Sequence, residues 1–366
     1  MIPEVTVMMP VYNARPYLRA AVGSILTQTL ANLKLLIIDD GSDDGSAELL
    51  QELASTDARI ELIRRHRMGQ VETRNELLYR AETELVACAD ADDISVPARL
   101  SDQLARMRAD SGLVVLGTQL RIIDSSGHVR GHMARPTGGA EVRKALLRGA
   151  AISQPSTMLR RAAIIAAGGY RKCYEHAEDY DMLLRAAEMG KVDNTEQIGI
   201  DYRVHEQSVS HRHAIRQMAS ADLARATHAL RTAGERDPTA GLQAVPAYDH
   251  PVMKALVPSA ALYAVLEMVR THPKEGPLQE LLSAAINRRQ QRHVQRALIA
   301  AVRQREFDAL SARALLRAVA LGPGRFIRSY RAAPGHREAV TPAGAREPHR
   351  PAEAISTQTN ERGRAR

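Results

Sequence analysis

Short apolar runs alternate with stretches of helical spacing through the first third of the chain. A continuous short apolar run is typical of a buried strand, whereas apolar residues three and four positions apart form one face of a helix. The predicted strands are residues 5–9, 33–38, 60–63, 84–89 and 113–116. The predicted helices between them are residues 16–29, 43–53, 70–81 and 97–108.

This alternation predicts an α/β fold with a Rossmann-like, mainly parallel sheet flanked by helices on both faces. In such sheets the ligand binds beyond the carboxyl ends of the strands. The loops after Met9, Ile38 and Ala89 are therefore the places where we expect functional side chains.

The second part of the chain is less regular. Residues 120–123 and 129–133 predict a hairpin, residues 177–188 and 212–231 predict helices, and residues 191–200 predict an extended segment. Pro238, Gly241 and Pro246 mark a linker. Basic helices are expected at about 251–271, 277–304 and 307–319. The expected organisation is a folded domain over 1–234, a linker over 235–250, a basic helical region over 251–330 and a disordered tail over 331–366.

The net charge of +8 is concentrated in the last third of the chain. Residues 251–330 hold 13 Lys+Arg and 5 Asp+Glu, and residues 331–366 hold 7 and 4, which leaves residues 1–250 at −3. An acidic partner of the C-terminal region, such as an anionic membrane surface, fits this distribution better than a nucleic acid does.

The sequence shows no pattern typical of a membrane span, a signal peptide or a cysteine-based site. We see no apolar run of about 18 residues, so no transmembrane helix is expected. The start, Met1-Ile2-Pro3-Glu4, does not have the pattern of a signal peptide. Cys88 and Cys173 form neither a disulfide framework nor a metal-binding spacing, which fits a reducing cytoplasm.

Carboxylates cluster directly after the predicted strand 84–89. Asp90, Asp92 and Asp93 stand within four consecutive positions. Like charges so close repel one another, and a divalent cation such as Mg²⁺ or Mn²⁺ relieves that cost because it prefers carboxylate oxygens. The alternative is a solvated acidic turn that caps the next helix, and the residue types alone leave both open.

Two further loops carry candidate ligand contacts. Asp39 and Asp40 follow the second strand, where a carboxylate can accept hydrogen bonds from a base or a sugar. Asp43 and Asp44 are better explained as N-terminal caps of the helix that follows. Tyr12 follows the first strand and is either a stacking platform for a base or a packing residue.

Taken in order, these motifs resemble family 2 glycosyltransferases. The resemblance starts with the string VTVMMPVYNARPYLRAAVGSILTQTLANLKLLIIDDGSDDGS and covers about residues 4–212. It continues through residues 69–75, 90–93, 168–170, 178–181 and 202–205. After about residue 235 no resemblance is evident. As an ordered set the motifs are specific, although each is weak alone.

The resemblance implies a nucleotide-diphospho-sugar transferase with an A-type fold and a site for the sugar donor. Tyr12 and Asp40 would contact the base, with Asp40 accepting from a uracil-like imide, and Pro10 would line that pocket through its backbone. Arg74 would reach the nucleotide, and Asp90 would hold the ribose or, through water, the metal. A UDP-sugar is the default donor, although GDP and dTDP donors occur in the family.

The resemblance also implies the chemistry. Asp92 would coordinate a divalent cation, Mn²⁺ or Mg²⁺, that bridges the donor phosphates. Asp179 would be the general base that deprotonates the acceptor hydroxyl, and in-line attack would invert the anomeric carbon. Arg185 is placed four residues after Asp181 to pair with it. His205 would be a metal ligand, a phosphate contact or a structural side chain, and these roles stay open. Gln154 would lie near the acceptor.

Three alternatives are weighed against this reading. A processive polysaccharide synthase would need transmembrane helices and a Gln-x-x-Arg-Trp segment, and the chain has no Trp. A sugar nucleotidyltransferase would need a Gly-rich loop where Pro10 and Tyr12 stand. A non-catalytic nucleotide-sugar-binding module would be expected to lack Asp92 or Asp179, and both are present.

The acceptor is expected to be a saccharide or a lipid-linked molecule in surface polysaccharide or glycolipid synthesis. The expected location is the cytoplasm, with peripheral binding to the inner membrane face as one hypothesis. Simple packing of the C-terminal helices on the catalytic domain or a second subunit is the alternative. The arginines that would suit a membrane-binding face are Arg288, Arg289, Arg292, Arg296 and Arg303.

Overall fold

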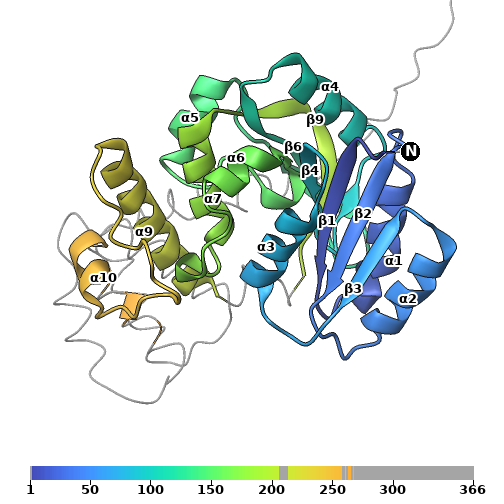
Figure 1. Cartoon of the computed structure of the whole chain (residues 1–366), viewed down its shortest axis with the longest axis horizontal. Helices are drawn as coiled ribbons and strands as arrows, with labels where there is room; N and C mark the ends of the chain where they lie inside the picture. Colours follow the sequence, from blue (N-terminus) through green and yellow to red (C-terminus); the bar gives the residue numbers. More distant parts are fainter. Residues whose placement is uncertain (1, 206–212, 258–259, 261–262, 265–266, 268–366) are drawn as a thin grey trace, which may run out of the picture.

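The computed structural model describes residues 2–205, 213–257, 260, 263–264 and 267. One nine-stranded sheet runs through it in the order β3-β2-β1-β4-β8-β6-β9-β5, and β7 pairs with β6 (Figure 1). The helices predicted at 277–304 and 307–319, the five arginines of the predicted membrane-binding face and the tail 331–366 lie outside the described residues.

The first half of the sheet is parallel, as the sequence predicts. Its strands are β1 (Val5–Val11), β2 (Leu33–Asp39), β3 (Ile60–Arg64) and β4 (Leu85–Cys88). The helices between them are α1 (Arg15–Leu26), α2 (Ser46–Thr56) and α3 (Gln70–Arg80). The middle strands are apolar at nearly every position because helices cover both faces of the sheet.

The second half of the sheet adds antiparallel strands to the parallel ones, which the sequence pattern does not predict. β8 (Met158–Arg160) lies between β4 and β6 (Leu113–Ile123) and is antiparallel to both. β9 (Lys191–Arg203) runs parallel to β6, and β5 (Ile94–Ser95) closes that edge. The α/β class with flanking helices is confirmed.

The predicted hairpin is confirmed, but its first strand is longer than predicted. β6 pairs with β7 (Val129–Met133) in antiparallel register, and it is continuous from Leu113. The helix α4 (Arg99–Ala109) begins two residues after Pro97. Besides β5 and β8, the sequence pattern missed the helical elements α5 (Gly139–Leu146), η1 (Gln154–Ser156), α6 (Arg161–Ala166) and η2 (Lys172–Tyr174).

Two apolar clusters fill the two sides of the sheet. Alternate residues of β1 divide between them, so that Val7 and Met9 pack in one cluster and Met8 in the other. The first cluster includes Leu18 and Ile25 of α1. This packing fixes the position of the strand ends, and therefore of the loops that follow them.

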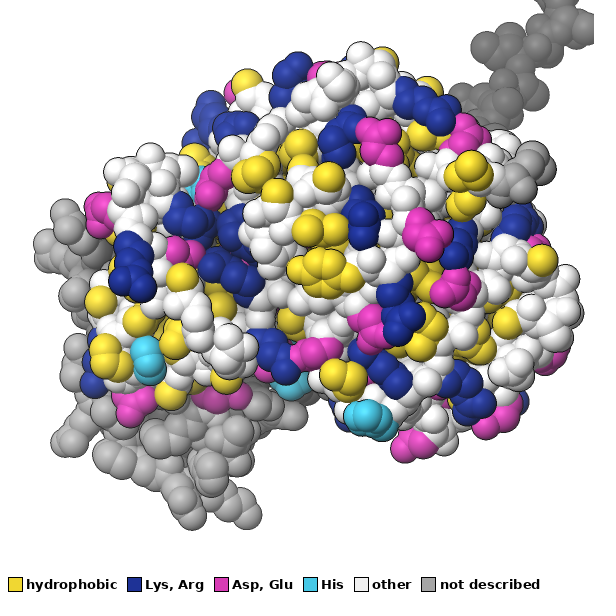
Figure 2. All heavy atoms as spheres, viewed as in Figure 1, with side chains coloured by type: hydrophobic (Ala, Val, Ile, Leu, Met, Phe, Trp, Pro, Cys, Tyr) yellow, Lys and Arg dark blue, Asp and Glu magenta, His cyan; other side chains and the backbone are white. Residues whose placement is uncertain are grey.

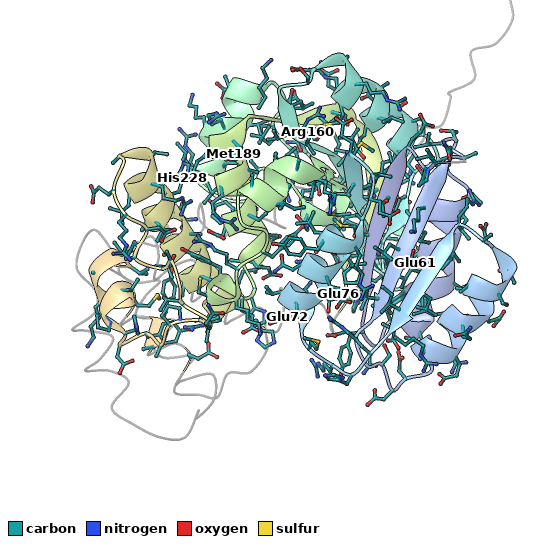
Figure 3. All side chains as sticks on the ribbon, viewed as in Figure 1. Glu61, Glu72, Glu76, Arg160, Met189 and His228 are labelled. Atoms are coloured by element: carbon teal, nitrogen blue, oxygen red, sulfur yellow. The ribbon has the colours of Figure 1, made fainter. Side chains whose placement is uncertain are left out.

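The second cluster extends past the sheet to an outer pair of helices. α7 (Glu178–Met189) packs against α9 (Ala214–Thr232), and α10 (Pro251–Leu256) packs on α9 in turn (Figure 1). His228 of α9 lies beside the end of α7, where its ring contacts Glu188 (Figure 3). The segment predicted as a linker is tied to the fold through Asp237.

Candidate active site

The loops after β1 and β2 are joined side by side. Asn13 Nδ2 donates to Asp43 Oδ1 at 2.8 Å, and the Asp43 N–H donates back to Asn13 Oδ1 at 3.0 Å. The Asn13 N–H donates to Ser42 Oγ at 3.0 Å. Asn13 adopts a left-handed backbone, with φ of 50°, a conformation that Asn tolerates better than most residues.

This arrangement corrects the capping role predicted for Asp43, whereas Asp44 keeps one. α2 begins at Ser46, with Gly45 before it in a left-handed conformation. Asp44 accepts from the Ser46 N–H at 2.9 Å and also from the Arg15 N–H at 3.0 Å, so it stabilises the start of both α2 and α1. Asp43 instead holds the β1 loop.

Asp40 is the centre of a third loop, residues 65–69. Its side chain is buried, and its Oδ1 accepts from the Met68 N–H at 2.9 Å and from Arg65 Nε at 3.1 Å. Its Oδ2 accepts from the Gly69 N–H at 2.8 Å. The carboxylate expected to contact a base therefore already orders the loop between β3 and α3.

Tyr12 lies at the exposed end of the β1 loop. Its side chain is 39% exposed, which leaves the ring accessible for stacking. The guanidinium of Arg67 lies 4.0 Å from the ring centroid, and Arg67 Nη1 donates to the Tyr12 hydroxyl at 3.0 Å. An Arg–Tyr pair of this kind presents a planar, cationic surface at the expected base site.

The acidic motif after β4 forms one compact cluster. Asp90, Asp92 and Asp93 place carboxylate oxygens within 4.8 Å of one another. Asp93 Oδ1 accepts from the Arg203 N–H at 2.8 Å, and its other oxygen is buried without a described partner. Asp92 Oδ2 lies 2.9 Å from His205 Nε2.

These residues fit a divalent cation. Burial raises the pKa of Asp90 to about 6; the charges of Asp92 and Asp179 add to this shift and Arg74 opposes it. Burial, with the neighbouring carboxylates, raises the pKa of Asp93 well above its usual range. Hard oxygen ligands that are costly to ionise without a cation are the donor set that Mg²⁺ and Mn²⁺ take.

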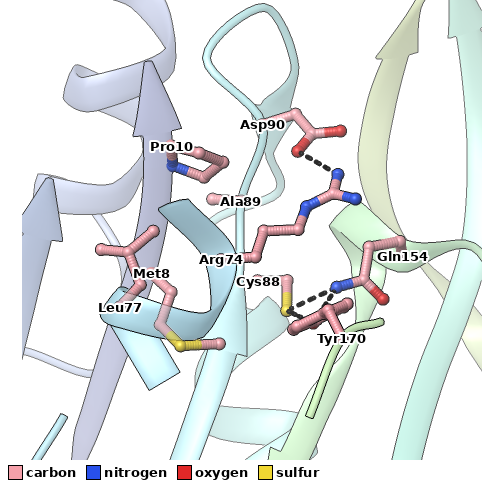
Figure 4. Close-up of a pocket in the computed structure, with 9 residues that line it drawn as sticks. All are labelled: Met8, Pro10, Arg74, Leu77, Cys88, Ala89, Asp90, Gln154 and Tyr170. Atoms are coloured by element: carbon pink, nitrogen blue, oxygen red, sulfur yellow. Dashed lines mark hydrogen bonds and ion pairs between the residues drawn. The ribbon is translucent and has the colours of Figure 1, made fainter. Parts of the chain in front are cut away.

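Arg74 joins the acidic cluster to the start of α7. The Arg74 side chain is buried, and its Nη1 donates to Glu178 Oε1 at 2.7 Å. Its Nη2 lies 3.7 Å from Asp90 Oδ1 (Figure 4). Burial raises the pKa of Glu178 to about 7, although Arg74 opposes the shift. Glu178 Oε2 is buried and has no described partner. Arg74 thus links two motifs that are far apart in the sequence.

A small pocket opens where these motifs meet. Pro10 and Asp90 lie at one side of it, Arg74 at its centre, and Gln154 with Tyr170 at the other side (Figure 4). Gln154 Nε2 donates to Cys88 Sγ at 3.3 Å and to the Tyr170 hydroxyl. The sequence pattern gave Tyr170 no role of its own and assigned Gln154 only by resemblance, because both reach the pocket from separate loops.

Asp179 lies in the first turn of α7, beside the same charges. It is half-buried, and its Oδ1 accepts from the Tyr180 N–H at 2.7 Å. Its charge adds to the raised pKa of Asp90 and of Glu178, which places it within electrostatic range of both. The structure thereby brings together the predicted base and the predicted cation ligands.

Asp181 makes the ion pair that the helical spacing predicts. It is fully buried and pairs with Arg185, the predicted partner four residues along the helix, and with Arg171. The Arg171 pair has no signal in the helical spacing, because Arg171 lies before the helix. His205, whose role the sequence left open, contacts Asp92, and its ring lies 5.2 Å from that of Tyr17. His211 lies outside the described residues.

Comparison with known proteins agrees with this geometry. Residues 6–167 match the family model "Glycosyl transferase family 2". EpsE of Bacillus subtilis (strain 168), provisionally named as a glycosyltransferase, is 31% identical over 192 residues, which are 51% of this chain and 68% of EpsE. The O-antigen biosynthesis glycosyltransferase WbnJ of Escherichia coli is 28% identical over 209 residues, 56% of this chain and 81% of WbnJ.

A chondroitin synthase of Pasteurella multocida (strain Pm70) is 26% identical over 209 residues, 57% of this chain, but the match spans only 21% of that synthase. Among solved structures, S. aureus TarS 1–349 in complex with UDP has a TM-score of 0.50 at 16% identity, covering 90% of this chain and 89% of that one.

The mannosyltransferase PcManGT from Pyrobaculum calidifontis, in complex with GDP-Man and Mn²⁺, has a TM-score of 0.51 at 19% identity, covering 84% of this chain and 88% of that one. At these identities the structural likeness shows the fold. The sequence matches and the site geometry carry the assignment further: the chain belongs to glycosyl transferase family 2.

Proposed function

We propose that this chain is an inverting glycosyltransferase that moves a sugar from a nucleotide-diphosphate donor, by preference a UDP-sugar, to an acceptor hydroxyl. The observation that carries the proposal is the position of Arg74, which contacts Glu178 at the start of α7 and lies close to Asp90 after β4. Arg74 thereby holds the acidic cluster, which suits a cation, next to the start of α7, which carries the proposed base Asp179.

Asp179 is the proposed general base. It takes the proton of the acceptor hydroxyl while the acceptor oxygen forms a bond to the anomeric carbon of the donor sugar. The bond from that carbon to the phosphate oxygen breaks, and the nucleoside diphosphate leaves with the electron pair. Attack opposite the leaving group inverts the anomeric carbon, and no covalent enzyme intermediate is required.

The acidic cluster is the proposed holder of a divalent cation, with Asp92 and Asp90 as ligands and Asp93 supporting them. A bound Mn²⁺ or Mg²⁺ would stabilise the negative charge that develops on the leaving diphosphate. Both the fit of these oxygens to a hard cation and the Mn²⁺ in the PcManGT complex support this proposal.

The base side of the donor site is proposed at Pro10, Tyr12 and the 65–69 loop. Because both oxygens of Asp40 already accept from that loop, an imide contact from Asp40 would replace one of these bonds or add to them. The Tyr12–Arg67 pair supplies a stacking surface beside it.

The acceptor is proposed to be a saccharide or a lipid-linked molecule in polysaccharide or glycolipid assembly. The names of the relatives support polysaccharide synthesis as the broader setting.

Isothermal titration of UDP, GDP and dTDP, each with and without Mn²⁺, tests the donor proposal. We expect UDP to bind most tightly, and Mn²⁺ to strengthen its binding by at least about tenfold, as bridging of the phosphates requires. Tyr12→Ala should weaken UDP binding by about tenfold, since base stacking on an aromatic side chain contributes about 1–3 kcal/mol. Tyr79→Ala, which removes an exposed tyrosine of α3, is the matched control. Equal, metal-independent binding of all three nucleotides would contradict the proposal.

A further inference from the structure

Arg99 is a buried cation at the start of α4. Its side chain is 3% exposed, and each of its recorded hydrogen bonds goes to a neutral acceptor. The acceptors are Cys88 O at 2.7 Å, Ser95 Oγ at 2.9 Å, Gln103 Oε1 at 3.2 Å and Thr157 O at 3.3 Å. Within the described part of the chain, no carboxylate oxygen lies within 4.0 Å of it.

A buried guanidinium without a contacting carboxylate is costly, because neutral hydrogen bonds restore only part of its lost hydration. Burial accordingly lowers the pKa of Arg99 to about 10, and nearby acidic groups that include Asp93 and Asp90 oppose the shift. The charge of Arg99 is therefore balanced over distance rather than by a direct ion pair.

The hydrogen bonds of Arg99 reach the chain on both sides of the acidic cluster. Cys88 stands two residues before Asp90, and Ser95 stands two residues after Asp93. Arg99, Asp93 and Asp90 also line one small crevice. Asp93 Oδ2 is buried and lacks a described hydrogen-bond partner, so its charge needs another source of compensation.

We propose that Arg99 is the internal counter-charge of the Asp90–Asp92–Asp93 cluster. It is a positioning residue: it touches no reacting atom, but its charge allows three carboxylates to stay together when no cation is bound. The same charge repels an incoming cation, so Arg99 also sets how tightly the cluster binds one. The effect of Arg99 on cation affinity rests on the proposed cation site, whereas its role as counter-charge does not.

A purely mechanical role is the alternative. In that case Arg99 would contribute to stability only because its guanidinium donates to the main-chain carbonyls of Cys88 and Thr157. Lysine keeps the positive charge but loses the planar set of guanidinium donors, whereas methionine loses both the charge and the donors. The two substitutions therefore separate charge from hydrogen bonding.

A stability cycle without metal tests the counter-charge directly. We would measure Tm in EDTA for Arg99→Met and Arg99→Lys, each alone and combined with Asp93→Asn. The Tm loss from Arg99→Met should shrink by about half or more in the Asp93→Asn background, because one of the acids it balances is gone. The loss from Arg99→Lys should be the same in both backgrounds. An Arg99→Met loss that is equal in the two backgrounds would overturn the proposal.

The control is Arg161→Met. Arg161 also donates to main-chain carbonyls, those of Leu78 and Tyr79, but it lies at the start of α6 and away from the acidic cluster. Its Tm loss should not depend on Asp93→Asn. If Arg99→Met does not fold, the comparison of Arg99→Lys with Arg99→Gln gives the same contrast of charge.

Titration with Mn²⁺ alone is the second readout. Removal of a positive charge beside the site should tighten Mn²⁺ binding by at least about fivefold in Arg99→Met, whereas Arg99→Lys should stay within about twofold of wild type. Weaker binding in both variants would show a mechanical role and overturn the counter-charge. If the wild-type chain binds no Mn²⁺, the proposed cation site fails, and the metal-free cycle still decides the role of Arg99.

Discussion

At the residue scale, Asp93 shows that the acidic cluster is costly to keep ionised when no cation is bound. One of its oxygens accepts from the Arg203 N–H and the other is buried without a described partner. Burial and the neighbouring carboxylates raise the pKa of Asp93, so its contribution to stability becomes less favourable as pH rises.

Asp93→Asn should therefore stabilise the metal-free protein. The amide oxygen can still accept from Arg203, while the like-charge repulsion is lost. We expect Tm at pH 8 in EDTA to rise by a few degrees, with a smaller gain at lower pH, where protonation of the acidic cluster removes charge. Asp102→Asn, an exposed acid of α4, is the control and should change little. A lower Tm for Asp93→Asn at pH 8 would contradict this reading.

Asp90 makes a second residue-scale prediction, about pH. A carboxyl with a pKa of about 6 holds its proton below that pH, and the proton competes with a cation. Mn²⁺ affinity should therefore rise by about tenfold per pH unit up to about pH 6 and then level off. Asp90→Asn should weaken binding and flatten this dependence. Affinity that is constant between pH 5 and 8 in the wild-type chain would exclude the mechanism.

The sequence could place several of these residues but not their partners. Asp90, Asp92 and Asp179 were found from motifs, because each motif is a local string at the end of a strand or the start of a helix. The contact between Arg74 and Glu178 joins residues 104 positions apart, so no local pattern contains it. The same holds for Arg203, whose backbone N–H donates to Asp93 across 110 positions of the sequence.

At the element scale, the loops after β1, β2 and β3 act as one unit. Asp43 binds the first loop to the second, and Asp40 binds the second to the third. Gly41 lies at the junction with φ of 80°, and a Cβ there would lie 2.8 Å from the Arg67 backbone nitrogen. The shape of the proposed base site therefore depends on a glycine at this position.

Gly41→Ala and Gly127→Ala form a matched pair that tests this dependence. Both positions have φ between about 80° and 90°, but a Cβ at Gly127 meets nothing within 4 Å. Both variants should lose roughly 1 kcal/mol to backbone strain. Gly41→Ala should lose a further 1–3 kcal/mol, by the order of magnitude for overpacking, and should weaken nucleotide binding. Chemical denaturation and nucleotide titration measure the two effects, and equal losses at both sites would contradict the account.

The elements themselves show where periodicity is informative. The strands β1 to β4 and the helices between them are predicted correctly, because short apolar runs alternate regularly there with stretches of helical spacing. β5 and β8 are too short to show any period, and β8 enters the sheet between strands that precede it in the sequence. Periodicity therefore predicts the parallel strands of the sheet but not its short antiparallel ones.

At the scale of the whole molecule, a charged network fastens the outer helices to the helix that carries Asp179. Asp181 of α7 pairs with Arg171, Arg171 pairs with Asp237, and Asp237 pairs with Arg231 of α9. The network is mostly buried, so loss of one member leaves another charge without its partner. The segment around Asp237 is thus part of the folded unit.

Asp237→Asn should lower Tm by several degrees at neutral pH, because the two arginines lose a shared carboxylate. The pKa of Asp237 is lowered to about 2; burial raises it, but hydrogen bonds from Thr239 and Arg171 outweigh burial. Its contribution is therefore present above about pH 4 and is lost as pH falls toward 2. Asp249→Asn, an exposed acid of the same segment, is the control. Equal Tm values for the two variants would contradict this role.

The distribution of charge over the molecule is relevant to the proposed contact with a membrane. On the face shown in Figure 2, basic and acidic side chains are interspersed, while the excess of positive charge in the sequence lies after residue 250. Among the described residues, no helix is long and apolar enough to cross a bilayer. We expect salt-sensitive binding to vesicles that contain anionic lipid, lost when residues 251–366 are removed and the shortened chain is confirmed to be folded. Unchanged binding by the shortened chain would rule this surface out.

The most direct test of the central claim is sugar transfer and donor hydrolysis with a panel of UDP-, GDP- and dTDP-sugars, with and without Mn²⁺. Wild type should turn over one donor in a metal-dependent way. Asp179→Asn should lower kcat by about 10²–10⁴ while it still binds nucleotide, and Asp92→Asn should raise the Mn²⁺ concentration required. Asp102→Asn should match wild type. Turnover by Asp179→Asn at the wild-type rate would contradict its assignment as the base, and absence of nucleotide binding by the wild-type chain would contradict the account as a whole.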